Sequence, residues 1–272
     1  MLASAFVCHR RRVYFVQGCH ILQDGMKTMQ SAKYLFIGIA ASRRQAYLCN
    51  LIDKCKIKNK KLKSMGLLSK FFNNTRKPEG FLGRMMVNGM NGGGHARLAE
   101  WGLSFMPTKA DADVLDVGCG GGANIARHLK RCPQGTVTGI DYSPVSVQKS
   151  QQVNARAIAA GRCRVLEGSA AALPFEEGRF DLVSAFETVY FWPTIEECFR
   201  GVKRVLKEGG HFLIVNEDDG LTGKNEKWEK MIEGMHTYSP DELQRHLATA
   251  GFHDITVHTD PQRHWLCASA TK

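Results

Sequence analysis

Val114-Leu115-Asp116-Val117-Gly118-Cys119-Gly120-Gly121-Gly122 is the stretch of this sequence that decides the fold. Its first residues are typical of a short buried strand, and four glycines in the next five positions let the backbone turn sharply. Residues 123–130 then carry helix-forming side chains, so the unit is a strand, a glycine loop and a helix. The backbone N–H groups of such a loop can lie directly against a bound ligand.

A second strand and a carboxylate follow this loop. Residues 136–140 are an apolar run, and Asp141 comes directly after it, 23 residues beyond Gly118. An acidic side chain at the tip of the second strand is placed to accept hydrogen bonds from ribose hydroxyls. The loop and Asp141 together predict a cofactor that contains a nucleoside. Residues 118–123 also fit the G-x-G-x-x-G/A fingerprint, so the loop alone leaves a dinucleotide open.

Further motifs downstream narrow the choice of cofactor. In chain order they are Leu173-Pro174-Phe175, Phe180-Asp181-Leu182-Val183, Arg204 to Gly210, and Ala250-Gly251-Phe252. With the glycine loop at its head, this series resembles the class I S-adenosylmethionine-dependent methyltransferases over roughly residues 82–270. The resemblance is strongest to the small-molecule branch that includes the quinone-biosynthesis methyltransferases.

The resemblance implies a function. It implies S-adenosyl-L-methionine as cofactor and transfer of its methyl group to an O, N, S or C atom of a small-molecule acceptor, by in-line displacement. Two alternatives stay open: a dinucleotide-dependent oxidoreductase, and a non-catalytic protein that binds S-adenosylmethionine as a regulator. The identity of the acceptor and the oligomeric state are not readable from the sequence.

Strands and helices alternate from residue 112 onward, which predicts an α/β fold with a Rossmann-like, doubly wound, mostly parallel sheet and helices on both faces. The expected strands are 112–117, 136–140, 163–167, 181–186, 211–216, 254–258 and 264–269. Only Asp260-Pro261-Gln262 separates the last two, so we expect an antiparallel C-terminal hairpin. By resemblance, the last of the seven strands inserts next to the fifth.

Several helix ends carry local signals. Ser143 before Pro144 predicts an N-cap and a first-turn proline. Capping boxes are expected where Thr194 precedes Glu197 and where Ser239 precedes Glu242. Gly251 is expected to end the last helix as a C-terminal cap.

The chain divides into three parts by composition and motif. Residues 1–64 are a basic N-terminal extension that we expect to be disordered or outside the native fold; an organelle transit peptide is the other interpretation. Residues 65–111 are expected to form N-terminal lid helices, with flexible residues 88–95 before a helix. Residues 112–272 form the catalytic domain, with an insertion at 217–238 that carries a short helix and covers the acceptor pocket.

The net charge of +11 does not indicate a nucleic-acid partner. Residues 1–64 hold 13 Lys and Arg against two Asp, whereas the remaining residues hold 24 basic and 24 acidic side chains. The catalytic portion is therefore balanced, and no nucleic-acid binding is expected. The one apolar patch in residues 1–64, residues 34–41, is too short to span a membrane. The nine cysteines lack the paired spacing of zinc sites, so we expect no metal and a reducing, cytoplasmic location.

The predicted cofactor site contains residues from four strand ends. Gly118, Gly120 and Gly122 should line the methionine and ribose portions, and the resemblance implies that Asp116 orients the methionine ammonium. Asp141 is assigned to the ribose and Tyr142 to the adenine face. Where the family often has an aspartate near the adenine, this chain has Ser169-Ala170, and a serine hydroxyl is an uncharged acceptor. Phe186 and Glu187 complete this predicted set.

The predicted acceptor site follows the fourth strand. Glu187 is a candidate general base, a candidate partner for a cationic acceptor, or a residue that shapes the cofactor pocket through its backbone. Tyr190 and Trp192 are expected to wall the acceptor pocket. His95 and Tyr190 are further candidate catalytic groups, and His236 and Tyr238 are candidates on the substrate side. The cluster at 217–219 could bind an amine or a divalent ion, or be a solvated loop.

Overall fold

The computed structural model describes the backbone of residues 6–9 and 12–15, then Pro78, Gly80 and Val87, and then residues 93–223 and 225–272. By its internal contacts the chain splits into two units, Met1–Leu62 and Lys63–Lys272. The described part of the first unit is a ribbon of two antiparallel strands, β1 (Phe6–His9) and β2 (Arg12–Phe15). Most of the predicted extension, lid helices and 88–92 segment lies outside the described residues.

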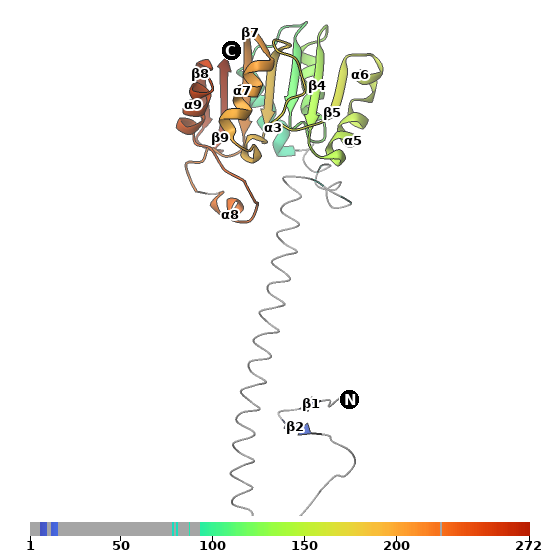
Figure 1. The fold of residues 1–272 in the computed structure, drawn as a ribbon, viewed down its shortest axis with the longest axis vertical. Coiled ribbons are helices and arrows are strands. Elements are labelled where there is room, and N and C mark those ends of the chain that lie inside the picture. The colour runs from blue at the N-terminus through green and yellow to red at the C-terminus, as the bar shows by residue number, and fades with distance from the viewer. Residues whose placement is uncertain are drawn as a thin grey trace, which may run out of the picture. The chain divides into compact units, whose positions relative to one another are not determined.

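The second unit is built on a seven-stranded sheet with the order β5-β4-β3-β6-β7-β9-β8. The five strands β3 to β7 run parallel, and β9 lies antiparallel between β7 and β8 (Figure 1). The sheet and its antiparallel C-terminal hairpin therefore confirm the prediction. The strands are β3 (Asp113–Val117), β4 (Thr136–Asp141), β5 (Cys163–Glu167), β6 (Phe180–Phe186), β7 (Leu206–Asn216), β8 (His253–Asp260) and β9 (Trp265–Thr271).

Helices cover both faces of this sheet (Figure 1). On one face α7 and α9 contribute buried residues such as Phe199 and Leu243 to one apolar cluster. On the other, α3 to α6 pack on a second cluster that contains Leu98 and Ile125. The helices are α3 (Gly93–Ser104), α4 (Ala123–Arg131), α5 (Pro144–Val153), α6 (Ala155–Ala159), the 3₁₀ turn η1 (Val189–Phe191), α7 (Ile195–Val205), α8 (Glu226–Glu229) and α9 (Pro240–Thr249). No helix among the described residues is long and apolar enough to cross a bilayer.

The helix starts follow their local signals with one exception. Ser143 accepts a hydrogen bond from the Ser146 backbone, and Ser239 forms a complete capping box with Glu242. Gly251 follows α9 with φ 88°, as a C-terminal cap requires. The predicted box at Thr194 is wrong: Thr194 has φ 42°, and its side chain makes no capping hydrogen bond. A cap needs an extended backbone to aim the hydroxyl at the first turn, and Thr194 lacks it.

Two other expectations need adjustment. The fifth strand of the sheet, β7, begins at Leu206 rather than at residue 211, and its register against β6 shifts between Phe180 and Leu182. The helix expected at 96–105 begins earlier, at Gly93, so the last residues of the supposed flexible segment are helical. In the 217–238 insertion, α8 provides the expected short helix and lies beyond the layered body in Figure 1.

Candidate functional site

The glycine loop after β3 adopts a backbone that only glycine takes without strain. Gly118, Gly120 and Gly122 have φ of 75°, 50° and 82°. The N–H groups of Gly118 and Cys119 donate to the Ile140 carbonyl at 2.7 and 3.1 Å, which ties the loop to the end of β4. The loop is therefore held as a rigid platform beside the strand ends, where open α/β sheets bind their ligands.

Gly118 also has no room for a side chain, and this predicts a specific loss of stability. A Cβ at Gly118 would collide with the Thr188 hydroxyl, which accepts a hydrogen bond of 3.1 Å from Trp192 Nε1, whereas a Cβ at Gly120 meets nothing within 4 Å. Both positions carry the strain of a positive φ. Gly118→Ala should therefore lower the free energy of unfolding by about 1–3 kcal/mol more than Gly120→Ala does. Urea titration measures this difference, and equal losses would contradict it.

Asp141 connects the end of β4 to the glycine loop. Its Oδ2 accepts from the Gly120 N–H at 2.9 Å, and its Oδ1 accepts from the Ser143 N–H at 2.9 Å. The carboxyl is buried, and burial raises its pKa against the opposing effect of these hydrogen bonds. Asp141 thus fixes both the loop and the start of α5 while lining a cavity.

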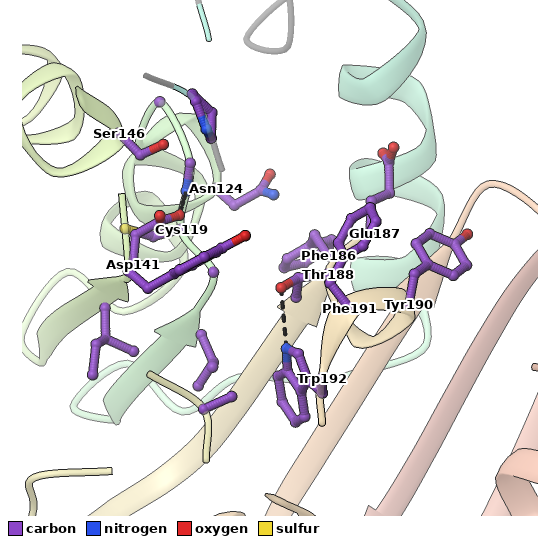
Figure 2. A pocket seen from close by; sticks show the side chains of 18 of the residues that line it. Cys119, Asn124, Asp141, Ser146, Phe186, Glu187, Thr188, Tyr190, Phe191 and Trp192 are labelled. Atoms are coloured by element: carbon purple, nitrogen blue, oxygen red, sulfur yellow. Dashed lines mark hydrogen bonds between the residues drawn. The ribbon is translucent and has the colours of Figure 1, made fainter. Parts of the chain in front are cut away.

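This cavity has a volume of about 590 Å³ and lies at the carboxyl ends of the strands. Figure 2 shows Asp141, Cys119 and Ser146 on one side of it and Glu187 and Tyr190 on the other. The structure brings most of the predicted site residues to this one cavity. They are His95, Gly118, Gly120, Asp141, Tyr142, Ser169, Ala170, Phe186, Glu187, Tyr190 and Trp192.

Asp116 is buried and is not among the residues that line the cavity. The Ser184 hydroxyl donates to its Oδ1 at 2.9 Å, and Ser184 is 3.0 Å from Nε2 of the buried His128. Its Oδ2 is buried and has no hydrogen-bond partner among the described residues. Burial raises the pKa of Asp116 to about 7. A buried carboxylate oxygen without a partner lowers the stability of the folded protein, and a positively charged ligand group nearby would offset this loss.

Gly122, His236 and Tyr238 are not among the residues that line the cavity, and their predicted roles stay predictions. Gly122 packs against α5, where the Asn154 side chain donates to its carbonyl at 3.0 Å. Tyr238 is buried in the core under α9. The His236 side chain is half exposed beside Glu242, but its backbone N–H donates to the Tyr190 carbonyl at 2.9 Å. Their contacts in the structure are in packing and in anchoring the turn that carries Tyr190.

His95 and Glu187 form a pair across the cavity wall. His95 lies in α3, and Glu187 follows β6 with a left-handed backbone at φ 56°. The His95 Nδ1 is 2.8 and 2.9 Å from the two carboxylate oxygens of Glu187. The hydrogen bond to Glu187 raises the pKa of His95, burial lowers it, and the charges of Glu187 and Glu217 raise it further. The net direction is upward, so His95 is a stronger base than a free histidine.

Glu217 extends this pair to a group of three. His95, Glu187 and Glu217 each offer one ligand atom, and all of these atoms lie within 4.8 Å of one another. Such a group could hold a cation, either a metal ion or a charged ligand atom. The sequence prediction of no metal site stays a prediction.

Aromatic side chains line the cavity near Glu187. The Tyr190 hydroxyl accepts from the Asp218 N–H at 3.3 Å, and burial raises the pKa of Tyr190 well above its ordinary value. Tyr190 therefore stays protonated near neutrality and serves as a wall rather than as a proton acceptor. The Trp192 indole is fixed by its hydrogen bond to Thr188, drawn as a dashed line in Figure 2.

Several lining residues were missed by the sequence reasoning. Asn124 and Arg127 come from the first turns of α4. The Arg127 guanidinium donates hydrogen bonds to Asn124 Oδ1 at 2.9 Å and to Glu100 Oε1 at 3.1 Å. Asn124 and Arg127 are three residues apart and so share one face of α4, which could have predicted that both lie beside the glycine loop. The insertion contributes further lining residues that were missed, and no local signal marks which of its residues face inward: they are Asn225, Trp228, Ile232 and Met235. Glu217, part of the predicted 217–219 cluster, also lines the cavity.

The comparisons with known proteins agree with this geometry. The family described as "Methyltransferase domain" matches residues 115–214. The structure is similar to an S-adenosylmethionine-dependent methyltransferase from Aquifex aeolicus, with a TM-score of 0.56 and 19% identity, covering 69% of this chain and 96% of that one. The match to the methyltransferase domain runs from β3 to β7 and includes the glycine loop, Asp141 and Glu187.

Two curated relatives show how far the similarity extends. The chain is 30% identical over 176 residues to 27-O-demethylrifamycin SV methyltransferase of Amycolatopsis mediterranei, covering 61% of this chain and 64% of that protein. It is 34% identical over 109 residues to botryococcene C-methyltransferase of Botryococcus braunii, covering 40% of this chain and 28% of that protein. The chain thus spans less than two thirds of either relative.

The methyltransferase fold does not fix the reaction. The [4+2]-cyclase SpnF has the same fold, with a TM-score of 0.54 and 19% identity, covering 65% of this chain and 80% of that one. Function in this family must therefore be argued from the side chains of the site.

Proposed function

We propose that this protein is a methyltransferase that moves the methyl group of S-adenosylmethionine to a small-molecule acceptor. One observation carries the proposal. A single cavity has the glycine loop and the Asp141 carboxylate at one end, and a histidine–carboxylate pair, His95 and Glu187, at the other. Figure 2 shows Asp141 and Glu187 on opposite sides of this cavity. A cofactor bound at the first end would present its reactive group to the second.

The residues at the cofactor end suit S-adenosylmethionine. Asp141 and the Gly120 backbone border the space for a ribose, and Tyr142, Ser169 and Ala170 border the space beyond it for a base. The buried Asp116 carboxyl, whose Oδ2 has no hydrogen-bond partner among the described residues, would favour an ammonium group at this end through its charge. When bound, S-adenosylmethionine supplies a methyl group on a cationic sulfur. The chain's own residues hold the two reactants in line, and such orientation contributes up to ~7–11 kcal/mol in favourable cases.

His95 is the proposed proton acceptor. An ionised Glu187 only accepts hydrogen bonds, so the proton shared by this pair sits on His95 Nδ1. In the neutral ring the lone pair is then on Nε2, which can take a proton from the acceptor. Glu187 stabilises the imidazolium that results. Tyr190 and Trp192 help to enclose the acceptor and exclude water.

Transfer of a labelled methyl group tests this proposal. The protein is incubated with S-adenosylmethionine labelled on its methyl group and with a panel of small acceptors, and labelled products are counted. Methylation of at least one acceptor, with release of S-adenosylhomocysteine, is expected. Tight binding of NAD or FAD in equilibrium dialysis, with no binding of S-adenosylmethionine, would support an oxidoreductase instead. Binding of S-adenosylmethionine with no transfer to any acceptor would favour a regulator.

We also propose that residues 1–64 take no part in the site. The glycine loop and Asp141 lie within residues 115–214, the part of the chain that matches the methyltransferase domain. A chain that starts at Met65 should therefore bind S-adenosylhomocysteine within about threefold of the full chain's affinity. Calorimetry on both chains measures this, and a tenfold loss on truncation would show that the extension contributes.

A further inference from the structure

We infer that the acceptor is an amine whose cationic nitrogen is bound at Glu217 and Glu187 before it is methylated. The inference rests on the proposed function and narrows it to one class of acceptor. Its basis is the juxtaposition of two carboxylates, a histidine base and aromatic faces at the acceptor end of the cavity.

Two carboxylates, those of Glu187 and Glu217, line this end of the cavity. A histidine oriented by a single carboxylate is sufficient for general base catalysis, and Glu187 already fills that role. Glu217 comes from a different element, the loop after β7, and its ligand atom lies within 4.8 Å of the other two. Both glutamates line the cavity, and their charges raise the pKa of His95 and of Tyr190. This second carboxylate lowers the free energy of a positively charged group placed in the cavity.

The aromatic walls favour the same class of ligand. Tyr190, Phe191, Trp192 and Trp228 all line the cavity, and aromatic faces attract cations as well as apolar groups. Ile232 and Met235 of the insertion add apolar surface on that side. An amine attached to an apolar or aromatic body matches both the charged and the apolar parts of this wall. A carboxylate or phosphate acceptor would meet like charges at Glu187 and Glu217.

The residues at this site can also remove the proton that a bound ammonium must lose before it is methylated. A bound ammonium has no lone pair, so one proton must first leave the nitrogen, and the lone pair of His95 Nε2 takes it. The nitrogen lone pair then forms a bond to the methyl carbon, and the carbon–sulfur bond breaks with its electrons remaining on sulfur. The cationic sulfur becomes a neutral thioether, and the methylated nitrogen regains a positive charge that the two glutamates neutralise.

A matched set of ligands tests the inference. Phenethylamine, 2-phenylethanol and 3-phenylpropionate share an aromatic body and differ in charge. Calorimetry on the full chain loaded with S-adenosylhomocysteine should show phenethylamine binding about tenfold more tightly than the alcohol, with the carboxylate weakest. Glu217→Gln should reduce this preference to about threefold or less. Glu226→Gln is the control, because Glu226 lies in the same insertion, pairs with Lys230 on the surface and does not line the cavity.

Methylation of the same three compounds separates this inference from the proposed function. The expected result is labelled product from the amine. Glu217→Gln should reduce the amount of this product more than Glu226→Gln does. Methylation of the alcohol with equal or weaker binding of the amine would overturn the inference and leave the proposed function intact. Failure of the amine to bind would also overturn it. A requirement for Mn²⁺ or Mg²⁺, with metal binding lost in His95→Ala, would assign the three side chains to a metal ion instead.

Discussion

Asp141→Ala should weaken the binding of S-adenosylmethionine by about 100-fold or more. Each hydrogen bond to a charged group contributes roughly 1.5–3 kcal/mol, and the substitution removes those expected from the ribose. It also leaves the N–H groups of Gly120 and Ser143 without the carboxylate that accepts from both. The glycine loop would then lose one of its connections to the end of β4. Calorimetric titration with S-adenosylmethionine and S-adenosylhomocysteine measures the change.

Two control variants make this result specific to Asp141. Asp141→Asn retains one acceptor oxygen but loses the charge, so its affinity should lie between those of the wild type and Asp141→Ala. Asp113→Ala removes a carboxylate at the opposite end of the sheet, where Asp113 accepts from the Thr136 hydroxyl at 2.6 Å, and should leave cofactor binding unchanged. A folded Asp141→Ala variant that binds the cofactor within threefold of the wild type would show that this carboxylate does not hold it.

The fold was predictable because its determinants are local. The glycine loop, the Ser143 N-cap, the capping box at Ser239 and the Gly251 cap each specify backbone geometry within a few residues. The errors arose where tertiary structure overrides a local pattern. Thr194 fits the spacing of a capping box, yet its backbone has a positive φ and its side chain makes no capping hydrogen bond.

The cofactor end of the site was more predictable than the acceptor end for the same reason. Gly118, Gly120 and Asp141 lie at strand ends that the sequence marks, and the topology of a parallel sheet brings those ends together. The acceptor end depends on side chains distant in sequence. His95 and Glu187 are 92 residues apart, and their pairing depends on how α3 packs across the sheet. Tyr238 and His236 carry plausible chemistry, but neither side chain faces the cavity.

The His95–Glu187 pair predicts a particular dependence of the reaction on pH. Only neutral His95 can take a proton, so kcat/KM should rise as pH increases through the pKa of His95. Glu187 raises that pKa through its hydrogen bond and its charge. Glu187→Gln should therefore move the rise to lower pH. It should also lower the maximal rate by about 10²-fold or more, because the imidazolium loses its counter-charge.

The variants around this pair separate a proton acceptor from a residue that only shapes the pocket. His95→Ala should lower the rate at every pH and remove the rise that Glu187→Gln only displaces. His236→Ala should leave the profile unchanged, because the His236 side chain does not line the cavity. S-adenosylhomocysteine affinity, measured on each variant, reports whether the cofactor end is intact. If Glu187→Gln kept both the inflection and the maximal rate of the wild type, the Glu187 carboxylate would not act on His95, and Glu187 would only shape the pocket through its left-handed backbone.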